Sequence, residues 1–203
     1  MPGGRARARA GGHAGTVTAP YPARVRVVAG ELRGRRLIAP SGDATRPTTD
    51  RVREAVFNAL ASLDVVVDAT VVDLYAGSGA LGIEALSRGA SSAVFVDRAP
   101  AAITAIRTNL ETLGIEADVR RMQAATALRT AATRGEAYDL VFLDPPYRRS
   151  AELGQELSEA LGALLAPGAR VISESDRRER LELTIPLTDE RRYGDTVIRI
   201  HGT

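Results

Sequence analysis

Four consecutive residues near the middle of the chain, Asp144-Pro145-Pro146-Tyr147, carry groups that could do chemistry. They directly follow residues 138–143, a run that is apolar apart from one aspartate. Such a run is typical of a buried parallel strand. In an open α/β sheet, ligands bind beyond the carboxyl ends of the strands. The sequence therefore predicts that Asp144 lies in a ligand site.

The four residues offer a rigid set of hydrogen-bond acceptors beside an aromatic face. Pro145 has a carbonyl but no N–H, and Pro146 biases it toward an extended conformation. A planar base with an exocyclic amino group fits this set, because its two N–H donors can meet the Asp144 carboxylate and the Pro145 carbonyl while its ring stacks on Tyr147. The alternative is a Pro-Pro turn without a chemical role. The tetrapeptide resembles the (Asn/Asp/Ser)-Pro-Pro-(Tyr/Phe/Trp) signature of amino-group methyltransferases, which use S-adenosylmethionine (SAM).

A glycine-rich segment upstream is a candidate cofactor loop. An expected strand at 71–75 leads into Gly77-x-Gly79-x-x-Gly82 and then a helix. Gly77 and Gly79 allow a tight turn and a close approach of a ligand to backbone N–H groups. The next expected strand, at 93–97, ends in Asp97, a residue type that binds the two ribose hydroxyls of a nucleoside.

This spacing also matches the dinucleotide fingerprint, so a NAD-dependent dehydrogenase is an alternative. Three observations argue against it. Asp73 lies just before the loop, where it would repel a pyrophosphate but could bind the cationic amino-acid end of SAM. The chain is too short for a separate substrate domain, and Asp-Pro-Pro-Tyr has no role in hydride transfer.

Composition limits the other possibilities. The chain has 203 residues, 44% of them hydrophobic, and no run long enough to span a membrane, so we expect one soluble cytoplasmic domain and a monomer. Cysteine is absent, which removes thiolate metal sites and the cysteine nucleophile used to methylate pyrimidine carbon. We expect both histidines, His13 and His201, to be solvated, and no metal site is predicted.

The charge is distributed unevenly along the chain. Residues 1–53 contain eleven arginines against three acidic residues, whereas the remainder is net acidic. A basic arm on an acidic body indicates a polyanionic partner. We expect residues 1–22, rich in Gly, Ala, Arg and Pro, to be a disordered tail, and a tail without a specific partner remains the alternative.

Two short strands are expected at 25–29 and 35–39, joined by residues 30–34. Alternating arginines on such a hairpin suit contact with phosphates, although a solvated edge hairpin would look the same. A helix follows, capped by Thr48 or Thr49. Near its start lie Arg46, Arg51 and Arg53, which could bind substrate phosphate or pair with local carboxylates.

The remaining elements are predicted from periodicity and turn residues. We expect helices at 99–113, 124–133 and 150–165, the last stopped by Pro167-Gly168. We expect further strands at 117–121, 138–143 and 170–174. A closing hairpin is expected from strands at 181–187 and 193–200, joined by 189–192.

Four stretches together resemble the RsmD family, bacterial methyltransferases that act on guanine N2 of small-subunit (16S) ribosomal RNA. The resemblance covers roughly residues 24–200. The stretches are Arg26-Val27-Val28-Ala29-Gly30-Glu31-Leu32-Arg33-Gly34-Arg35, Arg46-Pro47-Thr48-Thr49-Asp50-Arg51-Val52-Arg53-Glu54, Asp73-Leu74-Tyr75-Ala76-Gly77-Ser78-Gly79-Ala80-Leu81-Gly82 and Asp144-Pro145-Pro146-Tyr147.

The resemblance implies a Rossmann-like SAM-dependent methyltransferase fold: a seven-stranded, mostly parallel α/β sheet with the last strand antiparallel. It implies a tail at 1–22, a basic N-terminal hairpin at 23–45 and a methyltransferase domain at 46–203. The flipped guanine would contact the Asp144 to Tyr147 tetrapeptide. SAM would contact Asp73, Ala76, Gly77, Ser78, Gly79, Asp97, Arg98 and Ala125.

The implied partner is ribosomal RNA or a partly assembled small ribosomal subunit. Its contacts would be Arg24, Arg26, Arg33, Arg35, Arg36, Arg46 and Arg51. The chain departs from the family at Ala124, where Asn or Asp is frequent, so adenine would be bound through backbone groups. Two alternatives remain open: an adenine-N6 methyltransferase acting on DNA or RNA, and a non-enzymatic RNA-binding assembly factor.

Overall fold

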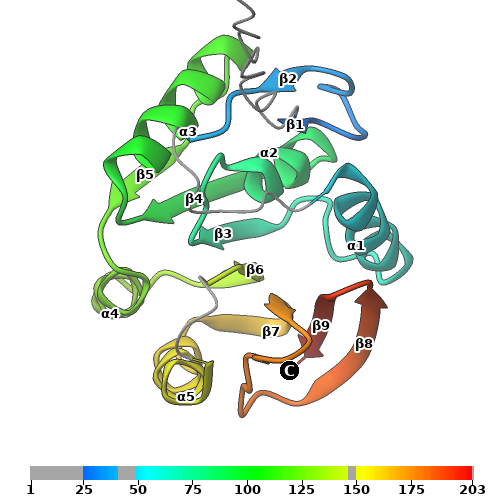
Figure 1. Ribbon diagram of the computed structural model, residues 1–203. Helices are drawn as coiled ribbons and strands as arrows, with labels where there is room; N and C mark the ends of the chain where they lie inside the picture. Colours follow the sequence, from blue (N-terminus) through cyan, green and yellow to red (C-terminus); the bar gives the residue numbers. More distant parts are fainter. Residues whose placement is uncertain (1–24, 41–48, 146–149, 203) are drawn as a thin grey trace, which may run out of the picture.

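The computed structural model describes residues 25–40, 49–145 and 150–202. Its centre is a seven-stranded sheet with the order β5-β4-β3-β6-β7-β9-β8 (Figure 1). The strands β3 to β7 run parallel, and β9 is antiparallel to both of its neighbours. This order confirms the predicted mostly parallel sheet with an antiparallel last strand. The strands are β3 Thr70–Leu74, β4 Ser92–Asp97, β5 Asp118–Arg121, β6 Tyr138–Leu143, β7 Leu165–Asp176, β8 Leu187–Tyr193 and β9 Thr196–Gly202.

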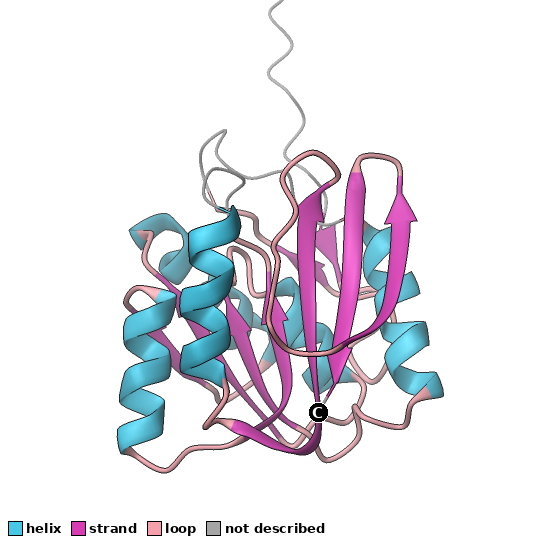
Figure 2. Ribbon diagram, turned by 90° about the horizontal axis from the view of Figure 1, so that it is seen from below, coloured by secondary structure: helices cyan, strands magenta, loops and turns pink. Residues whose placement is uncertain are grey.

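Helices cover both faces of the sheet, as expected for parallel strands joined by crossovers. One core lies against α1, α2 and α3, and the other lies against α4 and α5. Figure 2 views the sheet from the side of α4 and α5. In the first core, the rings of Phe57 in α1 and Phe142 in β6 are 5.5 Å apart. The helices are α1 Asp50–Ser62, α2 Ala80–Ser87, α3 Pro100–Leu113, α4 Ala124–Thr133 and α5 Ser150–Leu161.

The predicted N-terminal hairpin is present but has shorter strands, β1 Val25–Arg26 and β2 Arg36–Leu37. The residues between them turn sharply, with Gly30 and Gly34 both at φ +82°. Only glycine adopts this conformation without strain, so the chain folds back earlier than the alternating pattern suggests. The hairpin packs on the body through Val25, Val27 and Leu37, which belong to the first core.

The predicted end of the helix at 150–165 is wrong. The helix α5 ends at Leu161, and Leu165 already pairs with Tyr138 of β6. The Tyr138 N–H donates to the Leu164 carbonyl at 2.7 Å. Leu164 is buried in the second core and Leu165 packs against that core, and sheet pairing replaces the helical hydrogen bonds that their spacing predicted.

The predicted closing hairpin is also displaced. The strand expected at 181–187 is instead β8 at 187–193, and residues 189–192, expected to be the connection, lie within it. Gly194, with φ +64°, and the residue after it form the turn. The charged residues 189–192 are tolerated in this edge strand because they have partners there. Glu190 accepts hydrogen bonds from Arg192 at 2.8 Å and from Arg199 of β9 at 2.9 Å.

The expectation that His201 is solvated is wrong as well. His201 is buried in β9, and its Nδ1 lies 2.9 Å from the Ile185 carbonyl. Burial lowers its pKa, so the ring is a neutral packing residue. Within the part of the chain that the structure describes, no helix has the length and apolar character needed to cross a membrane.

Candidate active site

Several acidic side chains gather at the carboxyl edge of the parallel strands. Asp73 lies near the end of β3, Asp97 ends β4, and Asp144 directly follows β6. Because parallel strands end at the same edge, residues far apart in sequence meet there. Figure 1 shows β3 between β4 and β6, which agrees with the pairing of these parallel strands.

The cofactor loop joins β3 to α2 and has the backbone geometry expected of it. Gly77 and Gly79 have φ of +56° and +77°. A Cβ at Gly77 would meet only the Tyr75 carbonyl, at 3.9 Å, so the loop has room for a ligand beside it. A Cβ at Gly82 would lie 2.4 Å from the Phe95 ring, so this glycine lets α2 pack closely on β4.

Asp73 is buried and faces the start of α2. Its Oδ2 accepts a hydrogen bond from the Gly82 N–H at 2.9 Å. Burial raises its pKa to about 8, the Gly82 hydrogen bond opposes the rise, and the Asp97 charge adds to it. A cationic ligand would stabilise the ionised form of such a buried carboxyl. SAM has two cationic groups, its amino group and its sulfonium.

Asp97 holds the loop in place. Its two oxygens accept from the Gly77 N–H at 3.0 Å and from the Ala99 N–H at 2.8 Å. Arg98 comes next and is exposed, and Ala125 is buried in the first turn of α4, just after β5. The predicted cofactor residues, Ala76 and Ser78 of the loop included, thus lie at or just beyond the carboxyl ends of the neighbouring strands β3, β4 and β5.

Asp144 is partly buried and Pro145 is buried at the end of β6. Burial raises the pKa of Asp144 well above its usual range, and the charges of Glu174 and Asp73 raise it further. No described residue donates a hydrogen bond to its carboxylate. Pro146 and Tyr147, the rest of the predicted tetrapeptide, lie outside the described residues. Asp144 is therefore a carboxylate whose surroundings favour a ligand with N–H donors or positive charge.

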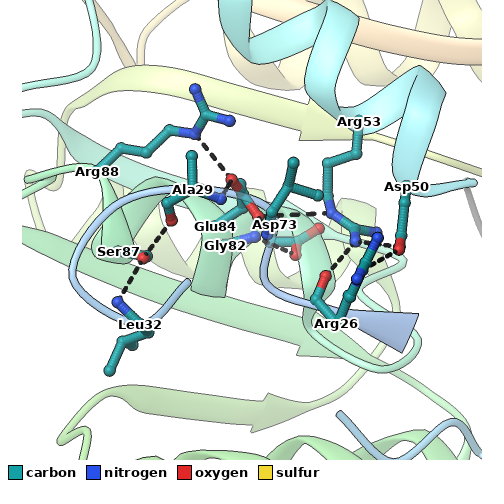
Figure 3. A network of polar contacts seen from close by, with 11 residues as sticks. Arg26, Ala29, Leu32, Asp50, Arg53, Asp73, Gly82, Glu84, Ser87 and Arg88 are labelled. Atoms are coloured by element: carbon teal, nitrogen blue, oxygen red, sulfur yellow. Dashed lines mark hydrogen bonds and ion pairs between the residues drawn. The ribbon is translucent and has the colours of Figure 1, made fainter. Parts of the chain in front are cut away.

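The hairpin is attached to α2 by buried polar contacts (Figure 3). Glu84, which is fully buried, accepts from the N–H groups of Val28 and Ala29 at 2.7 and 2.9 Å. It also accepts from Arg88 Nε at 2.8 Å, and Arg53 Nε lies 3.6 Å away. One helical side chain thus fixes the hairpin backbone next to the cofactor loop.

A second attachment runs through α3. The Asn109 Oδ1 accepts from the Ile38 N–H at 2.8 Å, and its Nδ2 donates to the Ile38 carbonyl at 3.0 Å and the Ser78 carbonyl at 2.9 Å. Asn109 therefore connects the segment after β2 directly to the cofactor loop.

All five described arginines that were predicted to contact RNA are exposed. Of the hairpin residues, Arg35 donates to the Thr112 carbonyl at 3.0 Å and Arg26 pairs with Asp50 at 2.9 Å. Arg53 is buried: it pairs with Asp50 at 2.8 Å and donates to the Arg26 carbonyl, so pairing with a local carboxylate is its role. Exposed residues of the set are Arg26, Arg33, Arg35, Arg36 and Arg51, while Arg24 and Arg46 lie outside the described residues.

Sequence reasoning did not single out Glu84, Asn109 or Glu174. Each is polar and buried. The signal was available for the first two, since each lies among apolar residues on the inner face of an expected helix, where a polar group needs a partner. Glu174 lies in the strand predicted at 170–174, but nothing in the pattern of that strand indicates a role for it.

Several known proteins resemble this chain in sequence and in fold. The chain matches the family described as Conserved hypothetical protein 95 over residues 25–202. It is 38% identical to YlbH of Bacillus subtilis over 187 residues, covering 87% of this chain and 98% of YlbH. It is 45% identical to ribosomal RNA small subunit methyltransferase D of Escherichia coli K12 over 125 residues, covering 62% of this chain and 61% of that enzyme. The solved structure of E. coli yhhF superposes with a TM-score of 0.74 at 37% identity, covering 88% of this chain and 97% of yhhF.

The sheet order, the glycine loop and the acidic residues at the strand ends define the class of SAM-dependent methyltransferases with a Rossmann-like fold. Within that class, the family match and the similarity to YlbH narrow the assignment. The chain belongs to the RsmD family.

Proposed function

We propose that this protein transfers the methyl group of SAM to the exocyclic N2 of a guanine in small-subunit ribosomal RNA. The observation that carries the proposal is the Asp144 carboxylate, which follows β6 at the same edge of the sheet as Asp73 and the cofactor loop. The name of the E. coli relative, a small-subunit ribosomal RNA methyltransferase, supports the substrate class.

The residues at the edge of the sheet fit SAM. Asp73 would hold its amino-acid end, the backbone at Gly77 and Gly79 would line it, and Asp97 would bind its ribose. When bound, SAM supplies a methyl group attached to a positively charged sulfur. This sulfur is a good leaving group because it departs as a neutral thioether. Positive charge beside Asp73 and Asp144 favours their ionised forms and offsets the burial that raises their pKa values.

Asp144 would act on the substrate amine. An aryl amine is a weak nucleophile because its lone pair is delocalised into the ring. A carboxylate that accepts one N–H, together with the Pro145 carbonyl accepting the other, turns the lone pair toward the methyl group. The Asp144 carboxylate also stabilises the positive charge that develops on nitrogen, so its contribution is positioning and electrostatics.

The exposed arginines of the hairpin would hold the RNA backbone. The hairpin contains four of them, Arg26, Arg33, Arg35 and Arg36, and Glu84 attaches its backbone to α2. The phosphate contacts would set the position of the RNA, while the groups at the end of β6 would select the base.

The test compares Asp144→Ala with the wild-type protein. The substrate is small ribosomal subunits from a strain lacking this protein, with labelled SAM as donor. We expect the variant to lose methyl transfer while its SAM affinity, measured by calorimetry, stays nearly unchanged. Asp118→Ala, which removes a carboxylate from the edge strand β5, is the matched control and should keep its activity.

Nucleoside analysis of the labelled product identifies the reaction. N2-methylguanosine supports the proposal, and N6-methyladenosine would show that the adenine alternative is correct. A protein that binds no SAM would instead be an RNA-binding assembly factor. Near-normal rates in Asp144→Ala would refute the role given to this carboxylate.

A further inference from the structure

A buried carboxylate lies next to the partly buried Asp144. Leu143 of β6 is paired with Ser173 of β7, so the next residues along the two strands are Asp144 and Glu174. Neighbouring strands are about 4.8 Å apart, which brings these residues side by side. Glu174 is only 6% exposed, and its charge contributes to the raised pKa of Asp144.

The neighbours of Glu174 on its face of the sheet are apolar. Glu174 is paired across the sheet with Ile198 of β9, and two residues earlier on the same strand face lies Ile172. Both isoleucines are buried in the first core. Burying two like charges together costs free energy unless a partner compensates them. Since no described residue donates a hydrogen bond to Asp144, a ligand that brings donors would supply part of that compensation.

The Watson–Crick edges of the bases differ in the donors they offer. Guanine has an N1–H directly beside its N2 amino group, so adjacent atoms both carry donors. Adenine has an acceptor nitrogen beside its amino group, and so does cytosine. An ionised carboxylate only accepts hydrogen bonds. Two carboxylates side by side therefore match guanine and present a lone pair to the ring nitrogen of adenine.

We propose that Glu174 determines base specificity, accepting the guanine N1–H while Asp144 accepts from the N2 amine. This inference rests on the proposed function and deepens it, because it names the group that reads the base. Adenine is rejected since its N1 lone pair would face the Glu174 carboxylate without a proton between them. Glu174 touches the base but takes no part in the transfer itself.

The test uses small-subunit ribosomal RNA assembled by ligation, with guanine or 2-aminopurine at the mapped target position. 2-Aminopurine keeps the amino group that is methylated but has an acceptor in place of the N1–H. We expect the wild-type protein to favour guanine by about ten- to hundred-fold in kcat/KM, the usual value of one base-edge contact. Equal rates on the two RNAs would overturn the inference without any variant.

The variant Glu174→Gln has the same shape and can donate as well as accept. We expect its guanine preference to fall to about threefold or less, because its amide can donate to the ring nitrogen of 2-aminopurine. Glu159→Gln makes the same chemical change on the exposed face of α5 and should keep the wild-type preference. Calorimetry with SAM shows that each variant is folded.

The possible outcomes separate the two proposals. If the wild-type protein forms N2-methylguanosine but Glu174→Gln binds SAM and keeps the full guanine preference, only the role of Glu174 is refuted. If the wild-type protein methylates adenine N6, the proposed function fails, and the role of Glu174 fails with it.

Discussion

The attachment of the hairpin can be tested by two glycine substitutions that differ in one respect. Gly30 and Gly34 both have φ +82°, so alanine is strained equally at either position. A Cβ at Gly34 has nothing within 4 Å, whereas a Cβ at Gly30 would lie 1.8 Å from the Ser87 carbonyl oxygen on α2. Only Gly30→Ala must therefore push the hairpin away from the helix.

The expected difference follows from the contacts that Ser87 makes. Its carbonyl accepts from the Glu31 N–H at 2.8 Å, its Oγ accepts from the Leu32 N–H at 3.0 Å, and its Oγ–H donates to the Ala29 carbonyl at 2.6 Å. The left-handed conformation costs a non-glycine residue about 1–2 kcal/mol. Three lost hydrogen bonds add about 3 kcal/mol at about 1 kcal/mol each. We thus expect a loss of about 1–2 kcal/mol for Gly34→Ala and about 4–5 kcal/mol for Gly30→Ala.

Urea denaturation of both variants measures these losses, and hydrogen exchange of the Glu31 and Leu32 amides shows whether the hairpin has detached. In methyl-transfer assays, Gly30→Ala should raise the KM for RNA and leave SAM affinity largely intact. Gly34→Ala should change neither by more than a small factor. Equal destabilisation by the two substitutions, with unchanged amide exchange, would refute the contact between the hairpin and α2.

Three further predictions concern the RNA surface, the cofactor site and the buried network. Simultaneous replacement of Arg33, Arg35 and Arg36 by alanine should weaken RNA binding. It should also reduce the slope of log K against log salt by about 2, since each phosphate contact contributes about 0.7–0.9. An unchanged slope in filter binding would place the RNA surface elsewhere. SAM binding at pH 7 should release a proton, because burial raises the pKa of Asp73 to about 8 and a cationic ligand favours the ionised carboxylate. Calorimetry in two buffers of different ionisation enthalpy detects the release, which Asp73→Asn should reduce. Glu84→Gln should lower the free energy of unfolding by about 2–3 kcal/mol, because it removes a buried charge that faces two arginines; a loss below about 0.5 kcal/mol in urea denaturation would contradict the network.

The sequence predicted best those features that depend on local patterns. The helix at 124–133 and the strand at 138–143 have the predicted bounds, because helical spacing and a nearly continuous apolar run are both local patterns. Thr49, one of the two predicted caps, does cap α1, with its Oγ1 accepting from the Val52 N–H at 3.3 Å. The Gly77 loop and Asp97 lie at the predicted edge because parallel strands place all their carboxyl ends there.

The misplaced elements depend on contacts between distant residues. The charged run at 189–192 looked like a connection, and only the position of Arg199 in β9 shows that Glu190 has a partner across the sheet. His201 looked solvated because it lies near the end of the chain, yet the Ile185 carbonyl covers it. The catalytic role of Asp144 and the roles of the exposed arginines stay predictions, since they concern ligands rather than the fold.

The helix α2 explains why polar contacts attach the hairpin in addition to the apolar packing of Val25, Val27 and Leu37. At its start, the Gly82 N–H is held by Asp73 beside the cofactor loop, and near its end Glu84 and Ser87 hold the hairpin. The helix has eight residues and is therefore about 12 Å long, too short to bend. Apolar contacts alone would let the hairpin shift along the helix at little cost, whereas hydrogen bonds to individual backbone groups permit one position. The arginines proposed to bind RNA would thus be fixed relative to the cofactor loop when the protein folds, before any substrate binds.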